Sequence, residues 1–265
     1  MSGRSREWNS GSRSMVSSTQ LELNIFQNLN DLSHQAATRF GELARKAVQA
    51  HGRFTVCLSG GSTPQLTYSL LADEPLRSQI PWGAVHIFWG DERCVPLERP
   101  DNHFTMTTGL LLSKAPIPAE NVHRMRGEAA DPFEAASEYE AFLREFFGLR
   151  PKELPRFDLI FLGMGADGHT ASLFPGTPGL EELDKLVIAH NVPKVGMNRL
   201  TLTYPVLNNA RVIMFLASGG EKAEALKSVL ANDIGAPTPP ARLVKPLEGE
   251  VIWMVDRAAA GLLDR

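Results

Sequence analysis

Short apolar runs alternate with helical patterns along most of this chain. Runs rich in branched and aromatic residues occupy 54–58, 84–89, 157–162, 186–189, 200–203, 212–217 and 251–255. Apolar residues at helical spacing follow an N-cap at Asn30 or Asp31, follow Pro64, and cover 132–147 and 221–230. This alternation is typical of α/β proteins, in which helices connect parallel strands. We therefore predict a mostly parallel sheet with helices on both faces.

Unusual turns follow four of the strand-like runs, at 59–62, 90–93, 163–169 and 218–222. The carboxyl ends of parallel strands meet at one edge of a sheet, and open α/β folds bind their ligands at that edge. If these four strands are parallel, residues far apart in the chain converge there.

The turn after the run 157–162 carries the residues best suited to chemistry. It reads Gly163-Met-Gly-Ala-Asp-Gly-His169 and places the carboxylate of Asp167 beside the imidazole of His169. Imidazole is the side chain most easily poised as a base near neutral pH. A histidine in a turn can also simply bond to backbone. The adjacent acid and glycines favour a base.

The same turn matches the G-x-G-x-x-G pattern of dinucleotide-binding proteins. That pattern requires a long helix directly after it, whereas Pro175, Gly176, Pro178 and Gly179 follow here. The acids at 181, 182 and 184 precede the next strand-like run instead of ending it. The sequence therefore argues against a nicotinamide cofactor.

The turn before the helix predicted at Pro64 suits a phosphate. Backbone N–H groups and the helix dipole attract anions at such a position. The spacing and lysine of a Walker A loop are absent. A tight turn with an ordinary Ser62 or Thr63 cap is the alternative interpretation. The candidate phosphate turn consists of Ser59, Gly60, Gly61 and Ser62.

Charged side chains accompany the other runs. Arg93 follows Asp91 and Glu92, and its guanidinium suits bidentate capture of phosphate or carboxylate. Alternatively, Arg93 pairs with one of these acids on the surface. Lys222 adds a cation to the same sheet edge, or is a solvated lysine at a helix start. Arg199 opens a strand-like run, where a basic residue is commonly an exposed edge charge.

Composition limits the partners and the setting. With 265 residues and 43% hydrophobic content, the chain can form a full core. We predict one domain at 21–265 and a tail at 1–20 that is disordered or an expression remnant. The net charge of −3 gives no basic footprint for nucleic acid, and no apolar run approaches the roughly 20 residues of a membrane span. Two cysteines and no paired histidine spacing predict neither a disulfide framework nor a metal site, and a cytoplasmic setting fits best.

Four blocks of the sequence closely resemble 6-phosphogluconolactonases and occur in that family's order. They are Ser59-Gly-Gly-Ser-Thr-Pro64, Gly90-Asp-Glu-Arg-Cys-Val-Pro96, Gly163-Met-Gly-Ala-Asp-Gly-His-Thr-Ala-Ser-Leu-Phe-Pro-Gly176 and Arg199-Leu-Thr-Leu-Thr203. The resemblance implies a modified doubly wound α/β sheet, as in glucosamine-6-phosphate deaminase and ribose-5-phosphate isomerase. It implies hydrolysis of 6-phospho-D-glucono-1,5-lactone in the oxidative pentose phosphate pathway, without cofactor or metal.

The resemblance also implies roles for individual residues. His169 would activate water as the base, and Asp167 would orient it. The partner would be a small sugar-phosphate lactone. Residues implied to bind it are Ser59, Gly60, Gly61, Ser62, Asp91, Arg93, Gly165, Arg199 and Lys222.

One position separates the lactonase from its relatives. The deaminase motif has a carboxylate five residues after the histidine, where this chain has Phe174. Lactone hydrolysis is therefore favoured over a deaminase or isomerase activity. A non-catalytic sugar-phosphate sensor is a further alternative. Such sensors carry a DNA-binding segment, and the residues before Leu21 are too few for a helix-turn-helix domain.

Overall fold

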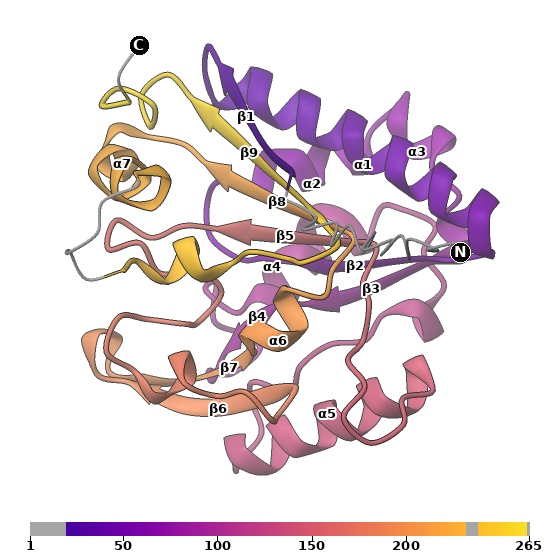
Figure 1. Cartoon of the computed structure of the whole chain (residues 1–265). Helices are drawn as coiled ribbons and strands as arrows, with labels where there is room; N and C mark the ends of the chain where they lie inside the picture. The colour runs from indigo at the N-terminus through magenta and orange to yellow at the C-terminus, as the bar shows by residue number, and fades with distance from the viewer. Residues whose placement is uncertain (1–19, 232–237, 264–265) are drawn as a thin grey trace, which may run out of the picture.

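The computed structural model describes residues 20–231 and 238–263, and a six-stranded sheet forms its centre (Figure 1). The strand order is β1-β9-β8-β5-β2-β3, and each neighbouring pair is parallel, as expected. The strands are β1 (Gln20–Phe26), β2 (Phe54–Leu58), β3 (Val85–Trp89), β5 (Leu159–Gly163), β8 (Val212–Ala217) and β9 (Glu250–Asp256). The tail predicted at 1–20 lies outside the described residues except for Gln20, which opens β1.

A separate three-stranded sheet contains most residues of the strand-like runs 186–189 and 200–203. It has the order β4-β7-β6 and is antiparallel, with β4 (Asp91–Arg93), β6 (Val187–Val192) and β7 (Met197–Leu202). Only the turn Pro193–Val195 and Gly196 connect β6 to β7. A parallel pair needs a crossover of a dozen or more residues, so this connection permits only a hairpin.

Helices cover both faces of the six-stranded sheet, as predicted (Figure 1). One face packs against α1 (Leu29–His51), α2 (Gln65–Ala72), α3 (Leu76–Gln79) and α4 (His103–Thr107). The other face packs against α5 (Pro132–Phe147), α6 (Tyr204–Leu207) and α7 (Ala223–Leu230). Single-turn segments lie at Trp82–Ala84, Thr108–Leu112, Ala119–Asn121, Pro178–Leu180, Pro193–Val195, Gly220–Lys222 and Pro240–Leu243. Within the described residues, none of the helices has both the length and the apolar character needed to cross a bilayer.

Local side-chain chemistry sets the helix ends. The N-cap of α1 is Asn28 and not Asn30 or Asp31, because the Asn28 side chain accepts a hydrogen bond from Asp31 N at 3.0 Å. Asp131 caps α5 in the same way, and Pro132 opens that helix. The helix expected at 221–230 begins at Ala223, after one 3-10 turn.

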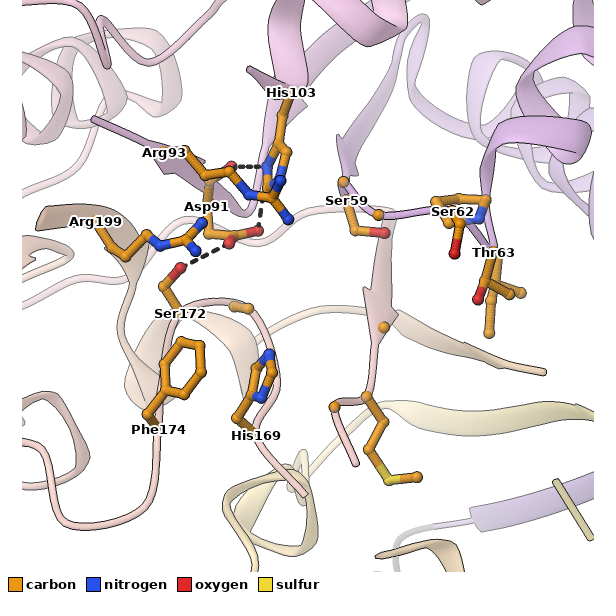
Figure 2. Close-up of a pocket in the computed structure, with 18 of the residues that line it drawn as sticks. Ser59, Ser62, Thr63, Asp91, Arg93, His103, His169, Ser172, Phe174 and Arg199 are labelled. Carbon is orange, nitrogen blue, oxygen red and sulfur yellow. Dashed lines mark hydrogen bonds and ion pairs between the residues drawn. The ribbon is translucent and has the colours of Figure 1, made fainter. Parts of the chain in front are cut away.

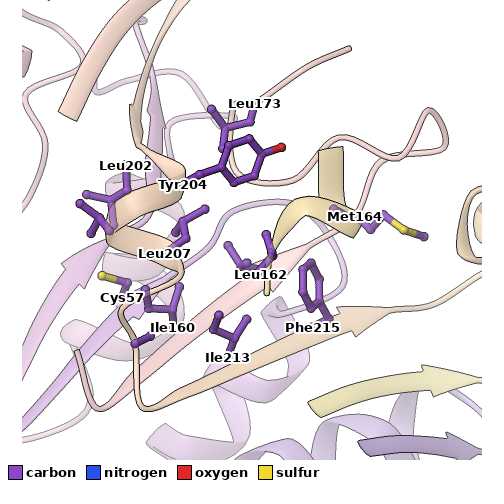
Figure 3. Close-up of a cluster of buried hydrophobic side chains, with 14 of the residues drawn as sticks. Cys57, Ile160, Leu162, Met164, Leu173, Leu202, Tyr204, Leu207, Ile213 and Phe215 are labelled. Carbon is purple, nitrogen blue, oxygen red and sulfur yellow. The ribbon is translucent and has the colours of Figure 1, made fainter. Parts of the chain in front are cut away.

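The core lies in two layers, one on each face of the six-stranded sheet. The layer in Figure 3 joins the strands to α6 and to the three-stranded sheet through wholly buried side chains such as Ile160, Phe215, Leu202 and Leu207. Because apolar burial contributes roughly 25 cal/mol per Å², this layer holds the two sheets in a fixed relation. The site between them depends on that relation.

Candidate active site

The turns that follow β2, β3, β5 and β8 converge on one pocket with the three-stranded sheet, as expected for parallel strands (Figure 2). Asp167 does not line the pocket but contacts His169, which does. The expected site residues that line it are Ser59, Gly60, Gly61, Ser62, Asp91, Arg93, Gly165, His169, Arg199 and Lys222. Sequence reasoning assigned no site role to Thr63, His103 or Ser172, which also line it.

The turn after β5 fixes His169 against Asp167. Asp167 Oδ1 lies 2.5 Å from His169 Nδ1 and accepts the His169 backbone N–H at 3.2 Å. A carboxylate only accepts hydrogen bonds, so Nδ1 carries the proton and Nε2 keeps its lone pair. Gly165 makes room for this geometry, because a Cβ there would lie 2.1 Å from His169 Nδ1. Nε2 is therefore the atom that can accept a proton.

Burial keeps the imidazole neutral. It lowers the pKa of His169 below its ordinary 6.5, while Asp167 and Asp91 act to raise this pKa and Lys222 acts to lower it. Burial also raises the pKa of Asp167, but hydrogen bonds from Lys194 and His169 outweigh that effect and bring the pKa well below its ordinary value. At neutral pH the pair is a carboxylate and a neutral imidazole, the form that can act as a base.

Phe174 covers one side of this imidazole. Its ring stacks on His169 with the centroids 3.9 Å apart and an angle of 19° between the planes. Only 5% of Phe174 is exposed. The position where a deaminase would need a carboxylate therefore carries an apolar surface that packs against the imidazole of His169.

Two arginines from neighbouring strands enter the pocket without a carboxylate partner. Arg93 and Arg199 are opposite one another in the β4–β7 pairing. Both Nε atoms are buried without a hydrogen-bond partner among the described residues, and the guanidinium of Arg93 donates from Nη1 to Asp101 O at 3.2 Å. In the described part of the chain neither arginine forms an ion pair, so the surface-pair interpretation of Arg93 is wrong.

Arg199 is also not an exposed edge charge, since only 7% of it is exposed. Burial lowers its pKa, against the opposing effect of Asp91, and Arg93 lowers it further. An arginine nevertheless stays charged at neutral pH. Arg93 is half-buried and Arg199 is buried. Their adjacent guanidinium groups repel each other, and a bound dianion would compensate both.

Asp91 connects the two sheets at the pocket. Its Oδ2 accepts a hydrogen bond from Ser172 Oγ at 2.7 Å, and Thr201, its partner in the β4–β7 pairing, accepts one from Ser172 N at 3.3 Å. Ser172 lies within one of the sequence blocks of the resemblance, but no spacing rule distinguished it. The segment that carries His169 is thereby attached to the three-stranded sheet.

The candidate phosphate turn leaves its hydroxyl groups available. The α2 helix has Pro64 as its N-cap residue and no side-chain cap, so the interpretation of Ser62 or Thr63 as an ordinary cap is wrong. Tyr68 OH holds the turn by accepting from Ser59 N at 3.0 Å and donating to Ser59 O at 2.8 Å. Ser59 Oγ is buried and has no hydrogen-bond partner within residues 20–231 and 238–263.

His103 is a pocket residue that the sequence did not reveal. Its Nδ1 donates to Asp91 O at 3.0 Å, and its Nε2 is buried without a partner in the described part of the chain. The ring lies against Gly60, where a Cβ would be 2.0 Å from Nε2. Gly60 is therefore required by this packing. The only sequence signal is Asn102, which caps α4 and so places His103 in its first turn.

Lys222 is the last residue of the turn Gly220–Lys222 and lines the pocket. Its side chain is 21% exposed. Its Nζ lies 3.9 Å from Glu221 Oε1, a loose ion pair. Among the residues described, no group of three or more histidines, cysteines and acids is arranged to hold a metal ion. The positive charge of the pocket lining comes from Arg93, Arg199 and Lys222.

Comparisons with known proteins agree with this geometry. A family model described as glucosamine-6-phosphate isomerases/6-phosphogluconolactonase matches residues 27–253. A 6-phosphogluconolactonase from Synechocystis sp. is 44% identical over 81% of this chain and 86% of its own, and one from Nostoc sp. is 41% identical over 82% and 88%. The solved 6-phosphogluconolactonase from Trypanosoma cruzi has a TM-score of 0.83 at 28% identity and covers 95% of this chain and 100% of its own. This chain belongs to the glucosamine-6-phosphate isomerase/6-phosphogluconolactonase family.

Proposed function

We propose that the protein hydrolyses 6-phospho-D-glucono-1,5-lactone to 6-phosphogluconate, with His169 as the general base. The observation that carries this proposal is the pocket itself. It joins two arginines whose buried Nε atoms lack a partner among the described residues, Arg93 and Arg199, to a neutral imidazole oriented by a carboxylate. The first element suits a phosphate and the second suits activation of water.

The reaction needs a base and a means of stabilising an oxyanion. His169 Nε2 takes a proton from water, and the resulting hydroxide attacks the lactone carbonyl carbon. The tetrahedral intermediate collapses by breaking the bond from this carbon to the ring oxygen, which receives the proton from the imidazolium. Asp167 stabilises the imidazolium between these steps. Water is consumed and the carboxylic acid is released without a redox change.

The phosphate and the sugar ring of the substrate occupy different parts of the pocket. The phosphate binds between Arg93 and Arg199, and this remote binding aligns the carbonyl with His169. The sugar extends along the candidate phosphate turn, where Ser59 Oγ has no partner among the residues described. Lys222, whose charge acts on His169, supplies positive charge where the carbonyl oxygen becomes negative.

A deaminase activity fits the pocket less well. It would need the carboxylate that Phe174 replaces, and Phe174 is packed against the ring of the base. Asp91 is the one carboxylate in the described pocket lining, and it already accepts a hydrogen bond from Ser172.

The decisive assay follows hydrolysis of freshly generated 6-phosphogluconolactone against its spontaneous rate, with chelator and without nucleotide. We expect clear acceleration. Ammonia release from glucosamine 6-phosphate serves as the parallel assay. Robust ammonia release without lactone hydrolysis would assign the protein to the deaminase branch, and binding of both sugar phosphates without turnover would make it a sensor.

A further inference from the structure

The tip of the β6–β7 hairpin reaches the catalytic pair from the other sheet. Lys194 lies in the single turn Pro193–Val195 that joins these two strands. The turn is tightly closed, because Gly196 N donates to Val192 O at 3.0 Å and to Pro193 O at 3.2 Å. Gly196 has a φ of 64°, a conformation that favours glycine. The hairpin therefore presents Lys194 from a defined position.

Lys194, Asp167 and His169 form a continuous chain of contacts. Lys194 Nζ lies 2.5 Å from Asp167 Oδ2, while Asp167 Oδ1 accepts the hydrogen bond from His169 Nδ1. Each carboxylate oxygen thus has a different partner. The Asp167 side chain is 19% exposed and that of Lys194 is 64% exposed. The cation consequently lies on the solvent side of the carboxylate, away from its contact with the imidazole.

We propose that Lys194 is a positioning residue which, through Asp167, holds His169 in its oriented form and moderates the charge that the carboxylate exerts on it. This inference deepens the proposed function and rests on it for the role of His169. Lys194 does not touch the reacting atoms in this arrangement. It acts through Asp167 alone.

The electrostatic sign of the effect is determined by geometry. Asp167 and Asp91 favour protonated His169, and Lys222 opposes it. The ammonium of Lys194 offsets part of the Asp167 charge. Replacing Lys194 by glutamine leaves that charge uncompensated, so the pKa of His169 rises. Replacing Asp167 by asparagine removes the charge, so the pKa of His169 falls. The two substitutions therefore shift the pKa of His169 in opposite directions.

A merely structural ion pair would behave differently. Exposed pairs contribute little to folding stability, and Lys194 is mostly exposed. Lys194→Gln should therefore leave the melting temperature nearly unchanged while it moves the titration of His169. An effect on stability without an effect on titration would describe a structural pair and would overturn the proposal.

The experiment titrates His169 by NMR of its ring nitrogens in the full-length protein, with the resonance identified by its loss in His169→Gln. We expect Lys194→Gln to raise the midpoint by roughly 0.5 pH unit, as suits a partly solvated charge. Lys194→Arg should restore the wild-type value, and Asp167→Asn should lower the midpoint. Lys185→Gln, at another exposed lysine, is the matched control and should change nothing.

The acid limb of kcat/KM for the lactone should move with the NMR midpoint. An unchanged midpoint in Lys194→Gln would overturn the proposal. So would an unchanged midpoint with a weaker preference for phosphorylated over unphosphorylated lactone, since that result would assign Lys194 to the substrate. The NMR titration requires no turnover, so it tests this inference even if the lactone is not hydrolysed.

Discussion

The two sheets build the pocket in different ways. The six-stranded parallel sheet contributes the turns at the ends of its strands, and with them backbone N–H groups, the candidate phosphate turn and His169. The three-stranded antiparallel sheet contributes side chains from within its strands, including Arg93 and Arg199 in cross-strand register. The parallel sheet thus supplies a common edge, whereas the antiparallel sheet supplies a charged face.

In the proposed mechanism this difference separates the base from the arginines that bind the phosphate. The proposed base His169 lies on a turn of the parallel sheet, and Arg93 and Arg199 lie on the antiparallel one. The antiparallel sheet connects to the His169 segment at two points. Asp91, Thr201 and His190 contact Ser172, and Lys194 of the β6–β7 turn contacts Asp167. Substitutions on the two sheets should consequently change different kinetic constants.

The largest expected effect lies on the parallel sheet. His169→Ala should lower kcat by roughly 10²–10⁴-fold and leave KM nearly unchanged, because a general base acts mainly in the transition state. Lactone hydrolysis is intrinsically easy, so the lower end of this range is expected. Steady-state kinetics on the phosphorylated lactone measure it. His34→Ala, at an exposed histidine of α1, is the control. A near-normal kcat in a folded His169→Ala protein would refute the assignment of the base.

The next effect lies on the antiparallel sheet. Arg199→Ala should raise KM for the phosphorylated lactone by roughly 10- to 100-fold, the value of a charge-assisted hydrogen bond. Arg199→Lys should raise this KM by a smaller factor, because lysine keeps the charge but loses the planar fork of the guanidinium. Turnover of unphosphorylated gluconolactone should not change. If both substrates lose activity equally, Arg199 does not anchor the phosphate and the division between the sheets fails. Arg150→Ala, at an exposed arginine, is the control.

The smallest effect tests the coupling between the sheets. Because the pKa of His169 is below 6.5, the acid limb of kcat/KM should have its midpoint below this pH, with activity rising as the imidazole loses its proton. Asp91 favours the protonated form, so Asp91→Asn should move the midpoint to lower pH, by less than about one unit. An asparagine oxygen can still accept from Ser172. A shift to higher pH would mean that Asp91 acts on the site by some other route.

The sequence predicted the parallel sheet well because its signal is local and repeated. The runs at 54–58 and 212–217 match β2 and β8 residue for residue, and the convergence of their turns followed from strand direction alone. The contact between Asp167 and His169, the proposed catalytic pair, was predictable for the same reason, since the two residues are neighbours in one turn.

The antiparallel sheet was missed for physical reasons. The β4 strand has three residues, too few to display any period, and its pairing with β7 is a contact between distant segments. The hairpin was foreseeable, since the turn at Pro193–Val195 is too short for a parallel crossover. His103 was not foreseeable, because its place in the pocket depends on how β4 docks beside the turn that contains Gly60.

Gly60 and His103 are distant in the sequence but lie in contact, so the residue at one position limits the residues possible at the other. A side chain at position 60 and a large ring at position 103 exclude each other, because the added carbon would occupy the place of the imidazole. A side chain added at position 60 alone clashes with the ring, whereas a smaller residue at position 103 makes room for it, so both changes together open an alternative pocket wall. Variants that reshape this wall should therefore be sought as pairs, and natural sequences should show the two positions changing in step.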